Sequence, residues 1–498
     1  MFKKVEKSFE SINKEDQNMQ TTKDLINFIK AGYSYFYVQS SEINKACEDI
    51  ETIIKEHKNG STYSIKRWDI ETDLDPELVI ELLKNEPTKT VIITKNYNWF
   101  LKDEMGNFNK AHIQHLQNSI DIYSSSEYRK ILIIVSDQDF GSAIPIQIQK
   151  EFVSLEYSLP DTNEIKEILE NLLIGFKENK AFTIPIEEEK EKIIDSAKGL
   201  TRREILNALS YSIVKDKGKI LSSTVSELQA KEVEKTAGLK IGKYNVPDLL
   251  GYNNLKNFVL STIKSKYSKG ILLLGPAGTG KTHFCKWIAQ KANMKIIEME
   301  MAELFGSLVG ESEKLMKRAI EIITANSPCI LFIDEIEKGL AGVGNSQTGD
   351  GGTTKRSMAQ FLKFLSDSRP EGVYVIATCN NISSLPPEWV RAERWDSAPF
   401  FVDLPSEMEA NAILEHYKNV YNVKGNPRNM KGWSGAEIKS VCRIAAMMET
   451  EIEGTERFII PVSKTMKDEI EGLRKWAEDK TIPSSIKDLK IVKRNIEI

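Results

Sequence analysis

Short apolar runs alternate with amphipathic stretches along most of the chain. In the second half the runs stand at residues 271–274, 296–299, 329–333 and 373–377. Runs of this length between polar or glycine-containing stretches predict buried strands. After residue 312 the apolar positions recur at helical spacing, at Leu315, Met316, Ala319, Ile320 and Ile323. This alternation predicts an α/β fold in which helices cover both faces of a parallel sheet.

The first half shows the same alternation and two further likenesses to the second half. Its candidate strands are residues 33–38, 90–94 and 131–135. A Leu-Pro pair followed by an Ile-Leu pair occurs within residues 159–169 and, at the same spacing, within 404–414. The capping-box pattern S/T-x-x-E joins Thr201 to Glu204 and Ser434 to Glu437. Both features are common, so chance is the alternative; we expect two copies of one module.

Length and composition predict a globular protein of several domains. The chain has 498 residues, more than one ordinary hydrophobic core contains. Its formal net charge of −4 gives no global attraction to nucleic acid or to anionic membranes, although a local basic patch is compatible with it. The five cysteines are scattered without a C-x-x-C pair, which predicts reduced structural thiols. The five histidines form no metal-ligand pattern.

The sequence predicts no membrane span and no targeting signal. No apolar run reaches the length that crosses a bilayer. The first residues lack the apolar core of a secretory signal and are too acidic for a transit peptide. We therefore expect the protein to work where it is made, in the cytoplasm or, if it is plastid-encoded, in the plastid stroma.

A phosphate-binding loop follows the candidate strand at 271–274. Residues 275–282 read GPAGTGKT and match the pattern G-x-x-x-x-G-K-[ST]. In such a loop backbone N–H groups point at phosphate oxygens, the lysine reaches the β- and γ-phosphates, and the final hydroxyl ligates Mg²⁺. A helix opening at the lysine adds its positive end. Since a strand precedes the loop and a helix follows it, we prefer a nucleotide site to a chance match. Its residues are Pro276, Ala277, Gly278, Thr279, Gly280, Lys281, Thr282 and His283.

Polar side chains end two later strands. Asp334 and Glu335 follow the strand at 329–333, where one carboxylate can hold Mg²⁺ and the next can polarise the attacking water. A solvated acidic pair is the alternative. Asn380 follows the strand at 373–377 and can orient the water. Arg391 and Arg394 share a predicted helical turn, and by themselves they fit a surface salt-bridge cluster better than a catalytic role.

Residues 245–450 resemble the AAA family of ATPases, within the wider AAA+ group. The likeness rests on the loop, the acidic pair, the segment DLLGYNNLK at 248–256 and the segment GWSGAE at 432–437. It implies a three-layer αβα domain with a small helical lid. It also implies that Asp248 and Gly251 lie beside the adenine and that the small residues Gly435 and Ala436 let the lid approach the base.

The resemblance also gives the polar strand-end residues and the arginines their roles. Asn380 takes the place of the family's sensor residue, and Arg391 and Arg394 take the place of arginine fingers that reach the ATP of a neighbouring subunit. Such a finger contributes roughly 10³–10⁵ in kcat. The implied assembly is a ring of six subunits, with ATP and Mg²⁺ at the subunit interfaces.

A closer resemblance singles out one branch of the family. Residues 342–362 and 460–480 and, less specifically, the N-terminal half are similar to uncharacterised AAA proteins encoded in algal plastids and cyanobacteria. The chain departs from the family at two places. Leu308 stands before Val309 and Gly310 in the pore loop, where threading machines carry an aromatic residue, and this argues against strong gripping of a polypeptide. Glu393 replaces the usual glycine between the two arginines.

These features divide the chain into tandem AAA-like modules. We expect a flexible N-terminus at 1–24, a degenerate nucleotide-free module at 25–215, a linker at 216–243, a large ATPase domain at 244–400, a lid at 401–453 and a tail at 454–498. The tail contains an amphipathic helix through Met466, Ile470, Leu473 and Trp476. The first module lacks the loop and the acidic pair, and Arg202 and Arg203 replace the two small lid residues.

The sequence therefore predicts ATP hydrolysis by a ring-forming AAA ATPase that remodels a macromolecular partner. It does not name that partner. The first alternative is a nucleotide-switched assembly scaffold or regulator that hydrolyses slowly and threads nothing. The second alternative is a motor associated with nucleic acid, against which the near-neutral charge argues weakly.

Overall fold

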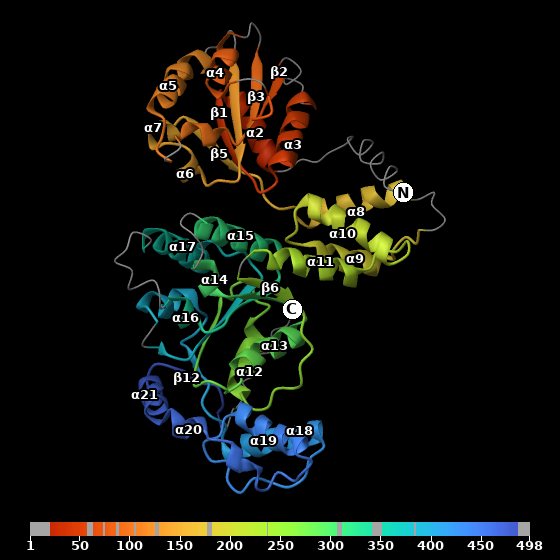
Figure 1. Cartoon of the computed structure of the whole chain (residues 1–498), viewed down its shortest axis with the longest axis vertical. Coiled ribbons are helices and arrows are strands. Elements are labelled where there is room, and N and C mark those ends of the chain that lie inside the picture. The colour runs from red at the N-terminus through yellow and green to blue at the C-terminus, as the bar shows by residue number, and fades with distance from the viewer. Residues whose placement is uncertain are drawn as a thin grey trace, which may run out of the picture. The chain divides into compact units, whose positions relative to one another are not determined.

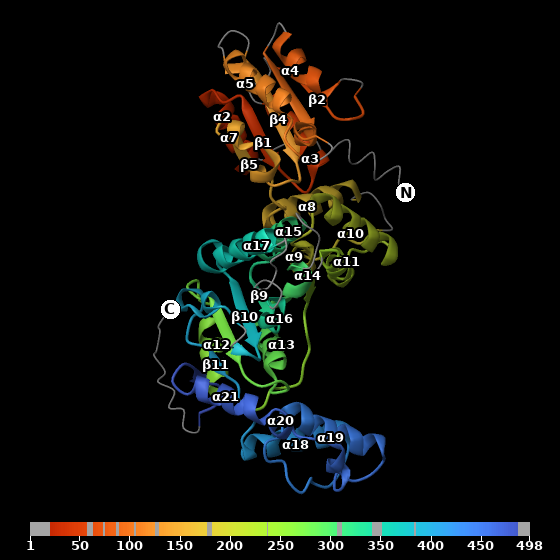
Figure 2. The same cartoon turned by 60° about the vertical axis from the view of Figure 1, so that its left-hand side comes forward.

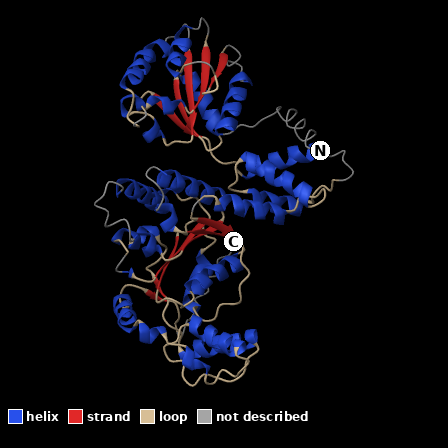
Figure 3. Cartoon of the chain, in the orientation of Figure 1, coloured by secondary structure: helices blue, strands red, loops and turns tan. Residues whose placement is uncertain are grey.

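The computed structural model describes the chain as two compact units (Figure 1). The described residues are 20–56, 63–72, 75–85, 89–103, 106–124, 129–176, 182–236, 238–305, 311–340, 351–382 and 385–486. Unit 1 comprises residues up to 190 together with 200–221, and unit 2 comprises 191–199 and the residues from 222 onward. Each unit contains a sheet with helices around it, which confirms the predicted α/β class (Figure 3).

Unit 1 contains a five-stranded sheet with strand order β2-β3-β4-β1-β5, in which all pairs run parallel. The strands are β1 (Tyr35–Gln39), β2 (Ser64–Trp68), β3 (Thr90–Lys95), β4 (Lys130–Ser136) and β5 (Phe152–Glu156). The helices around the sheet are α2 (Gln20–Ala31), α3 (Ile43–Glu56), α4 (Pro76–Asn85), α5 (Lys110–Ser124), α6 (Phe140–Ala143) and α7 (Ile146–Gln149). Helix α2 begins before residue 25, so the module starts earlier than expected.

Helices lie on both sides of the sheet of unit 1 (Figure 2), and its central strands β1, β3 and β4 are buried. Side chains of α2 and α3 pack on one face, against β-branched residues such as Ile131 and Ile133 of β4. Side chains of α4 and α5 pack on the other face, against neighbours such as Leu132 and Ile134. Successive residues of β4 thus serve opposite cores, because side chains alternate along a strand. This explains why β4 is apolar throughout its central run.

Two further helices of unit 1, α8 (Thr162–Phe176) and α10 (Arg202–Lys215), pack against each other. Helix α9 (Glu187–Ala197) crosses the boundary between the units. Asp161 and Glu164 cap the start of α8 reciprocally, and the predicted capping box of Thr201 and Glu204 opens α10.

Unit 2 contains a seven-stranded sheet with strand order β12-β11-β7-β10-β9-β8-β6. The strands are β6 (Leu239–Gly242), β7 (Gly270–Leu274), β8 (Lys295–Met299), β9 (Cys329–Ile333), β10 (Val373–Cys379), β11 (Phe400–Phe401) and β12 (Ile482–Pro483). Only β6 runs antiparallel to its neighbour. The five central strands have the same order as the sheet of unit 1, when each set is numbered along its own chain segment. The predicted repeat therefore extends to the topology of the sheets.

Helices cover both faces of this sheet and form a lid after it. Helices α12 (Asn253–Thr262) and α13 (Lys281–Ala292) pack on one face. Helices α14 (Met301–Phe305), α15 (Glu311–Ala325), α16 (Ile336–Leu340) and α17 (Gly351–Lys363) belong to the other side (Figure 1). The lid consists of α18 (Glu407–Tyr421) and α19 (Gly435–Met447), which share a core around Leu414 and Val441. Each lid helix opens with a capping box.

The stretch 216–243, expected as a linker, contains helix α11 (Ser222–Glu234) and β6 instead. The charged composition that predicted a linker belongs to the exposed face of α11, where Lys231 pairs with Glu227. Val225 and Val233 of the same helix are buried. The expected tail helix is present as α21 (Lys467–Ala477), preceded by α20 (Val462–Thr465). No helix among the described residues combines the length and the apolar character needed to cross a bilayer.

Candidate nucleotide site

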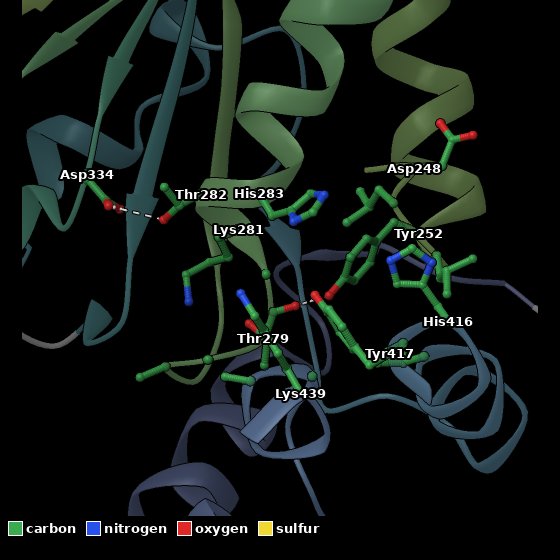
Figure 4. A pocket seen from close by; sticks show the side chains of 18 of the residues that line it. Asp248, Tyr252, Thr279, Lys281, Thr282, His283, Asp334, His416, Tyr417 and Lys439 are labelled. Atoms are coloured by element: carbon green, nitrogen blue, oxygen red, sulfur yellow. Dashed lines mark hydrogen bonds between the residues drawn. The ribbon is translucent and has the colours of Figure 1, made fainter. Parts of the chain in front are cut away.

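A cavity of about 340 Å³ lies between the phosphate-loop motif and the lid of unit 2 (Figure 4). It opens at the carboxyl ends of β7, β9 and β10, the edge at which parallel α/β sheets bind ligands. Most predicted site residues line it: Asp248, Ala277, Gly278, Thr279, Gly280, Lys281, Thr282, His283, Asp334, Glu335, Asn380, Gly435 and Ala436. Pro276 and Gly251 do not line the cavity, but the residues that follow them in sequence, Ala277 and Tyr252, do.

Three glycines of the loop are unsuited to carry a side chain, two because of their backbone conformation and one because it has no room. Gly278 and Gly280 have φ of 78° and 95°, the left-handed region that other residues rarely adopt. A Cβ on Gly275 would lie 2.1 Å from the carbonyl oxygen of Val402. The lid touches the loop, because the N–H of Ala436 donates to the carbonyl of Gly278 at 3.2 Å. The small lid residue therefore brings the start of α19 onto the phosphate loop.

Lys281 is buried at the start of α13 and points into the loop. Its ammonium donates to the carbonyls of Gly275 and Pro276, both at 2.8 Å. Burial lowers the pKa of Lys281 from its usual 10.5 to about 8, although the nearby carboxylate of Asp334 opposes this shift. A buried ammonium whose hydrogen bonds go to backbone carbonyls is suited to bind a phosphate anion, which would raise its pKa again.

Asp334 connects two hydroxyl groups at the strand ends. Thr282 donates from Oγ1 to Asp334 Oδ2 at 3.1 Å, and Thr378 donates to Asp334 Oδ1 at 2.5 Å. Thr378 in turn accepts the backbone N–H of Glu335 at 2.8 Å. Thr378 therefore fixes both acids relative to β10. Thr378 was not among the predicted site residues, although its place near the end of β10, two residues before Asn380, is a signal for such a role.

The oxygen atoms of Thr282 and Asp334 fit a magnesium ion. Mg²⁺ prefers hard oxygen ligands and keeps several waters, so that one or two protein groups plus phosphates suffice. No group of three or more His, Cys, Asp or Glu side chains within the described parts of the chain could hold a metal ion by itself. The donor set thus fits a metal that arrives with a nucleotide, and does not fit a resident metal centre.

Glu335 lies beside Asp334 in an unusual backbone conformation. Its φ of 47° falls in the left-handed region, which costs a non-glycine residue about 1 kcal/mol or more. Asn380 donates from Nδ2 to Glu335 Oε1 at 2.8 Å, and Lys338 pairs with the other carboxylate oxygen. The backbone N–H of Asn380 donates to the buried Glu337 at 2.9 Å. The predicted sensor and the predicted base are therefore in direct contact.

The predicted adenine segment reaches the cavity, but the Asp248 carboxylate turns away from it. Asp248 accepts from the indole N–H of Trp287 at 3.0 Å and pairs with Lys291 at 2.9 Å. The hydrogen bond from Trp287 lowers the pKa of Asp248, with a further contribution from Lys291. Gly251 has a φ of 76°, and a Cβ there would lie 2.5 Å from Oε1 of Glu409. Gly251 thus lets the segment pass close to the lid.

Aromatic, aliphatic and basic residues that were not among the predicted site residues complete the wall of the cavity. They are Tyr252 after the turn at Gly251 and Ile413, His416, Tyr417 and Lys439 from the lid, together with Leu249 and Leu250. The hydroxyl of Tyr252 donates to the carbonyl of Thr279 across the cavity, and burial raises the Tyr252 pKa (Figure 4). The three lid positions 413, 416 and 417 share one face of α18 at i, i+3 and i+4, a spacing that could have revealed them.

The two predicted finger arginines do not line the cavity of their own chain. Arg391 is exposed and has an extended backbone conformation just before the short 3-10 turn Ala392–Arg394. The expectation that both arginines lie on one helical turn is therefore wrong. Arg394 is half-buried, and its Nε donates to Ser366 Oγ at 3.1 Å. The predicted pore-loop residues Leu308, Val309 and Gly310 lie outside the described residues.

Comparison with known proteins identifies two domain families. The family model described as "ATPase family associated with various cellular activities (AAA)" matches residues 271–401, and the model "SpoVK-like AAA ATPase, N-terminal domain" matches residues 21–157. The chain is 28% identical to the "Uncharacterized AAA domain-containing protein ycf46" of Guillardia theta, over 92% of this chain and 95% of that protein. The protein of the same name from Pyropia yezoensis is 29% identical, over 93% of this chain and 98% of its own length.

More distant relatives match a smaller share of the chain. "Proteasome-activating nucleotidase 1" of Haloferax volcanii is 31% identical over 43% of this chain and 53% of that protein. The cavity, its phosphate loop and its acidic strand end all belong to unit 2 and lie within or beside the matched AAA segment. The chain therefore carries an AAA ATPase domain and is homologous, over most of its length, to the ycf46 AAA proteins of algal plastids.

Proposed function

We propose that this protein is an AAA ATPase that hydrolyses ATP within a ring of identical subunits and thereby remodels a macromolecular partner. The observation that carries the proposal is the convergence of Lys281, Thr282, Asp334, Glu335 and Asn380 at one edge of the sheet, under a lid. The name of the Haloferax volcanii relative, which activates the proteasome, supports a remodelling role at a general level.

The side chains have separate roles in this mechanism. Lys281 neutralises charge on the β- and γ-phosphates, and Asn380 holds the Glu335 carboxylate in place through the contact of 2.8 Å. Glu335 accepts a proton from water as the water oxygen bonds to the γ-phosphorus. The bond from that phosphorus to the β–γ bridging oxygen breaks, which leaves ADP and inorganic phosphate. Thr282 and Asp334 would hold Mg²⁺, which when bound neutralises charge on the phosphates.

We assign the finger role first to Arg391. Its side chain is exposed and lies outside the cavity of its own chain, so it needs a neighbouring subunit to reach a phosphate. Arg394 is held by Ser366 within its own chain, which suits it to anchoring the turn that carries Arg391. These positions support ATP binding at an interface between subunits, and hence a ring; six subunits is the number that the family resemblance implies.

We propose that unit 1 binds no nucleotide. The connection between β1 and α3 comprises residues 40–42 only, too few for a phosphate-cradling loop. Arg202 lies where Gly435 lies in unit 2, and its buried guanidinium pairs with Glu42 and with Glu164, each at 2.9 Å. The guanidinium also stacks on the ring of Tyr157 at 4.6 Å. A cavity of about 1090 Å³ remains beside Glu42, Arg202 and Arg203, but these ion pairs and the short connection leave it without a phosphate-cradling loop. The module is free to serve as a structural or partner-binding domain.

The proposal is tested by comparing Glu335→Gln with Glu388→Gln, an exposed acid of the same domain. We expect Glu335→Gln to lower ATP turnover by roughly 10²–10⁴-fold while nucleotide binding is retained. Glu388→Gln should leave both unchanged. Equal turnover in wild type and Glu335→Gln would remove Glu335 from its role. Absence of nucleotide binding by the wild-type chain would refute the function as a whole.

A slow nucleotide-switched scaffold is the second candidate, favoured by Leu308 in place of the aromatic pore residue. The two functions differ in how a partner changes the rate. Glu335→Gln, which should retain ATP and partner together, can be used to isolate a partner for the assay. A remodelling ATPase turns over faster when that purified partner is added, whereas a scaffold changes its assembly state with nucleotide and keeps the same low rate.

A further inference from the structure

The tail of the chain returns to the ATPase sheet next to the nucleotide cavity. Strand β12 pairs in parallel with β11, so that Phe400 lies opposite Ile482. The N–H of Ile482 donates to the carbonyl of Pro399 at 2.9 Å, and the N–H of Ser484 donates to the carbonyl of Phe401 at 3.0 Å. Residues 482–486 thereby extend the sheet, and we call them the tail clip.

The tail clip holds the start of helix α12. The preceding residue, Tyr252, has a φ of 57° and provides no side-chain cap. The carbonyl of Ser484 instead accepts the N–H groups of Asn254 and Leu255, both at 3.1 Å, and the Asn254 N–H also donates to Oδ1 of Asn253 at 2.8 Å. Asn253 completes the contact, because its side-chain amide donates to the carbonyl of Ile486 at 2.8 Å and accepts the Ile486 N–H at 2.9 Å. The N-terminal N–H groups of a helix need such acceptors.

The same five residues hold the turn that lines the cavity. The backbone N–H of Tyr252 donates to Ser485 Oγ at 3.0 Å. The side chain of the same Tyr252 lines the nucleotide cavity, and its hydroxyl donates to the carbonyl of Thr279 in the phosphate loop. Ser485 is therefore one residue removed from the cavity wall, although it is 233 positions from Tyr252 in the sequence.

The tail also binds the segment that joins the sheet to the lid. Ser485 donates from Oγ to Glu409 Oε1 at 2.7 Å, and Glu409 caps the first lid helix, α18. Arg474 of α21 makes a two-pronged pair with Asp403, which lies between β11 and α18, at 2.8–3.1 Å. Sheet, cavity wall and lid are thus joined by one stretch of tail.

We propose that the tail clip is a positioning element of the nucleotide site: it fixes Tyr252 against the phosphate loop and sets the lid on the sheet, and so determines nucleotide affinity. A site whose wall is already ordered binds its ligand more tightly, because binding then does not include the entropic cost of ordering the wall. The inference rests on the proposed nucleotide binding by unit 2. It adds that part of the site is supplied by residues 482–486, which lie beyond the matched AAA segment.

The test compares three chains by titration with ADP. One ends after Thr481 and lacks the clip, one ends after Ile486 and keeps it, and the third is the full chain. We expect the chain ended after Thr481 to bind ADP at least about ten-fold more weakly than the other two. If the chain ended after Thr481 binds ADP as tightly as the other two or more tightly, the positioning role of the tail clip is refuted. If the full chain does not bind ADP, the proposed function is refuted together with that role.

Point variants cover the case in which truncation prevents folding. Ser485→Ala removes the bonds to Tyr252 and Glu409, and Ser261→Ala removes an exposed hydroxyl that bonds within α12. We expect the dissociation constant of ADP to rise about three- to ten-fold in Ser485→Ala and to stay unchanged in Ser261→Ala. Equal dissociation constants in the two variants, whatever their melting temperatures, contradict a positioning role.

A second measurement uses the reciprocity of coupled equilibria. If the clip raises ADP affinity, ADP must stabilise the docked clip by the same factor. Lys480 is exposed just before β12, so trypsin cleavage after it reports release of the tail. We expect saturating ADP to slow this cleavage in the wild type about ten-fold and in Ser485→Ala less. Cleavage at one rate with and without ADP would count against the coupling.

Discussion

The buried lysine of the phosphate loop predicts that nucleotide affinity falls as pH rises through about 8. The pKa of Lys281 is lowered to about 8 by burial, so the free site loses its positive charge above that pH. Bound phosphates raise the pKa again, because an adjacent negative charge favours the protonated form. Binding therefore requires a proton that the free site has lost at high pH, and affinity decreases there.

The size of the effect follows from linkage. If the bound form keeps its proton, the apparent dissociation constant of ADP rises about 25-fold, or ~1.9 kcal/mol, between pH 7.5 and 9.5 for a free-site pKa near 8. An ordinary lysine with a pKa of 10.4 would change it by only about 10% over the same range. The phosphates of ADP contribute no slope, since their last ionisation lies near pH 6.

Two variants isolate Lys281 in this titration. Lys281→Arg stays charged throughout, so its affinity should be independent of pH whatever its absolute value. Lys295→Met removes another buried lysine, which lies at the start of β8, outside the cavity, and pairs with Asp195. Burial lowers the pKa of Lys295 to about 8 as well. We expect this control to keep the wild-type slope. A flat wild-type profile, or an undiminished slope in Lys281→Arg, would refute the electrostatic reasoning.

Other substitutions give further expectations. Subunits with Arg391→Ala mixed with subunits carrying Lys281→Ala should recover part of the ATPase activity if fingers act between subunits; no recovery at any ratio contradicts that arrangement. Thr378→Val should lower turnover and reduce stability by about 1–3 kcal/mol, as measured by denaturant unfolding, because Asp334 and the Glu335 N–H lose their partner. Arg202→Met should destabilise unit 1 by roughly 1–3 kcal/mol in the same assay, since two half-buried carboxylates lose their ion pairs; a change below 0.5 kcal/mol, roughly the effect of an ordinary surface substitution, would show that the pairs are dispensable.

Local patterns predicted most of the phosphate side of the site. The strand before the loop, the loop itself and the helix after it are adjacent in sequence, so their residue types and spacing determine their geometry together. Asp334 and Asn380 were also predictable, because parallel strands bring their carboxyl ends to one edge of the sheet. Both residues line the cavity of unit 2.

Residues brought to the site by tertiary packing could not be predicted in the same way. Tyr252 reaches the cavity only because Ser485 and the turn at Gly251 hold it there, and neither contact leaves a pattern in sequence. The charge-rich stretch 216–243 resembles a linker in composition because the buried side of α11 consists of a few residues between exposed ion pairs. Amphipathic helices with narrow apolar faces resemble linkers when composition is the guide.

The most direct test of the account is the number of nucleotides bound per chain. If unit 2 holds the working site and unit 1, which has no phosphate-binding loop, binds no nucleotide, titration calorimetry of the wild-type chain with ADP should give one site per chain. The variant Lys281→Ala should show none in the same concentration range, and Arg203→Ala, a change at an exposed position of unit 1, should still show one. Two sites in the wild type, or one site retained in Lys281→Ala, would contradict the division of the chain into one nucleotide-binding module and one nucleotide-free module.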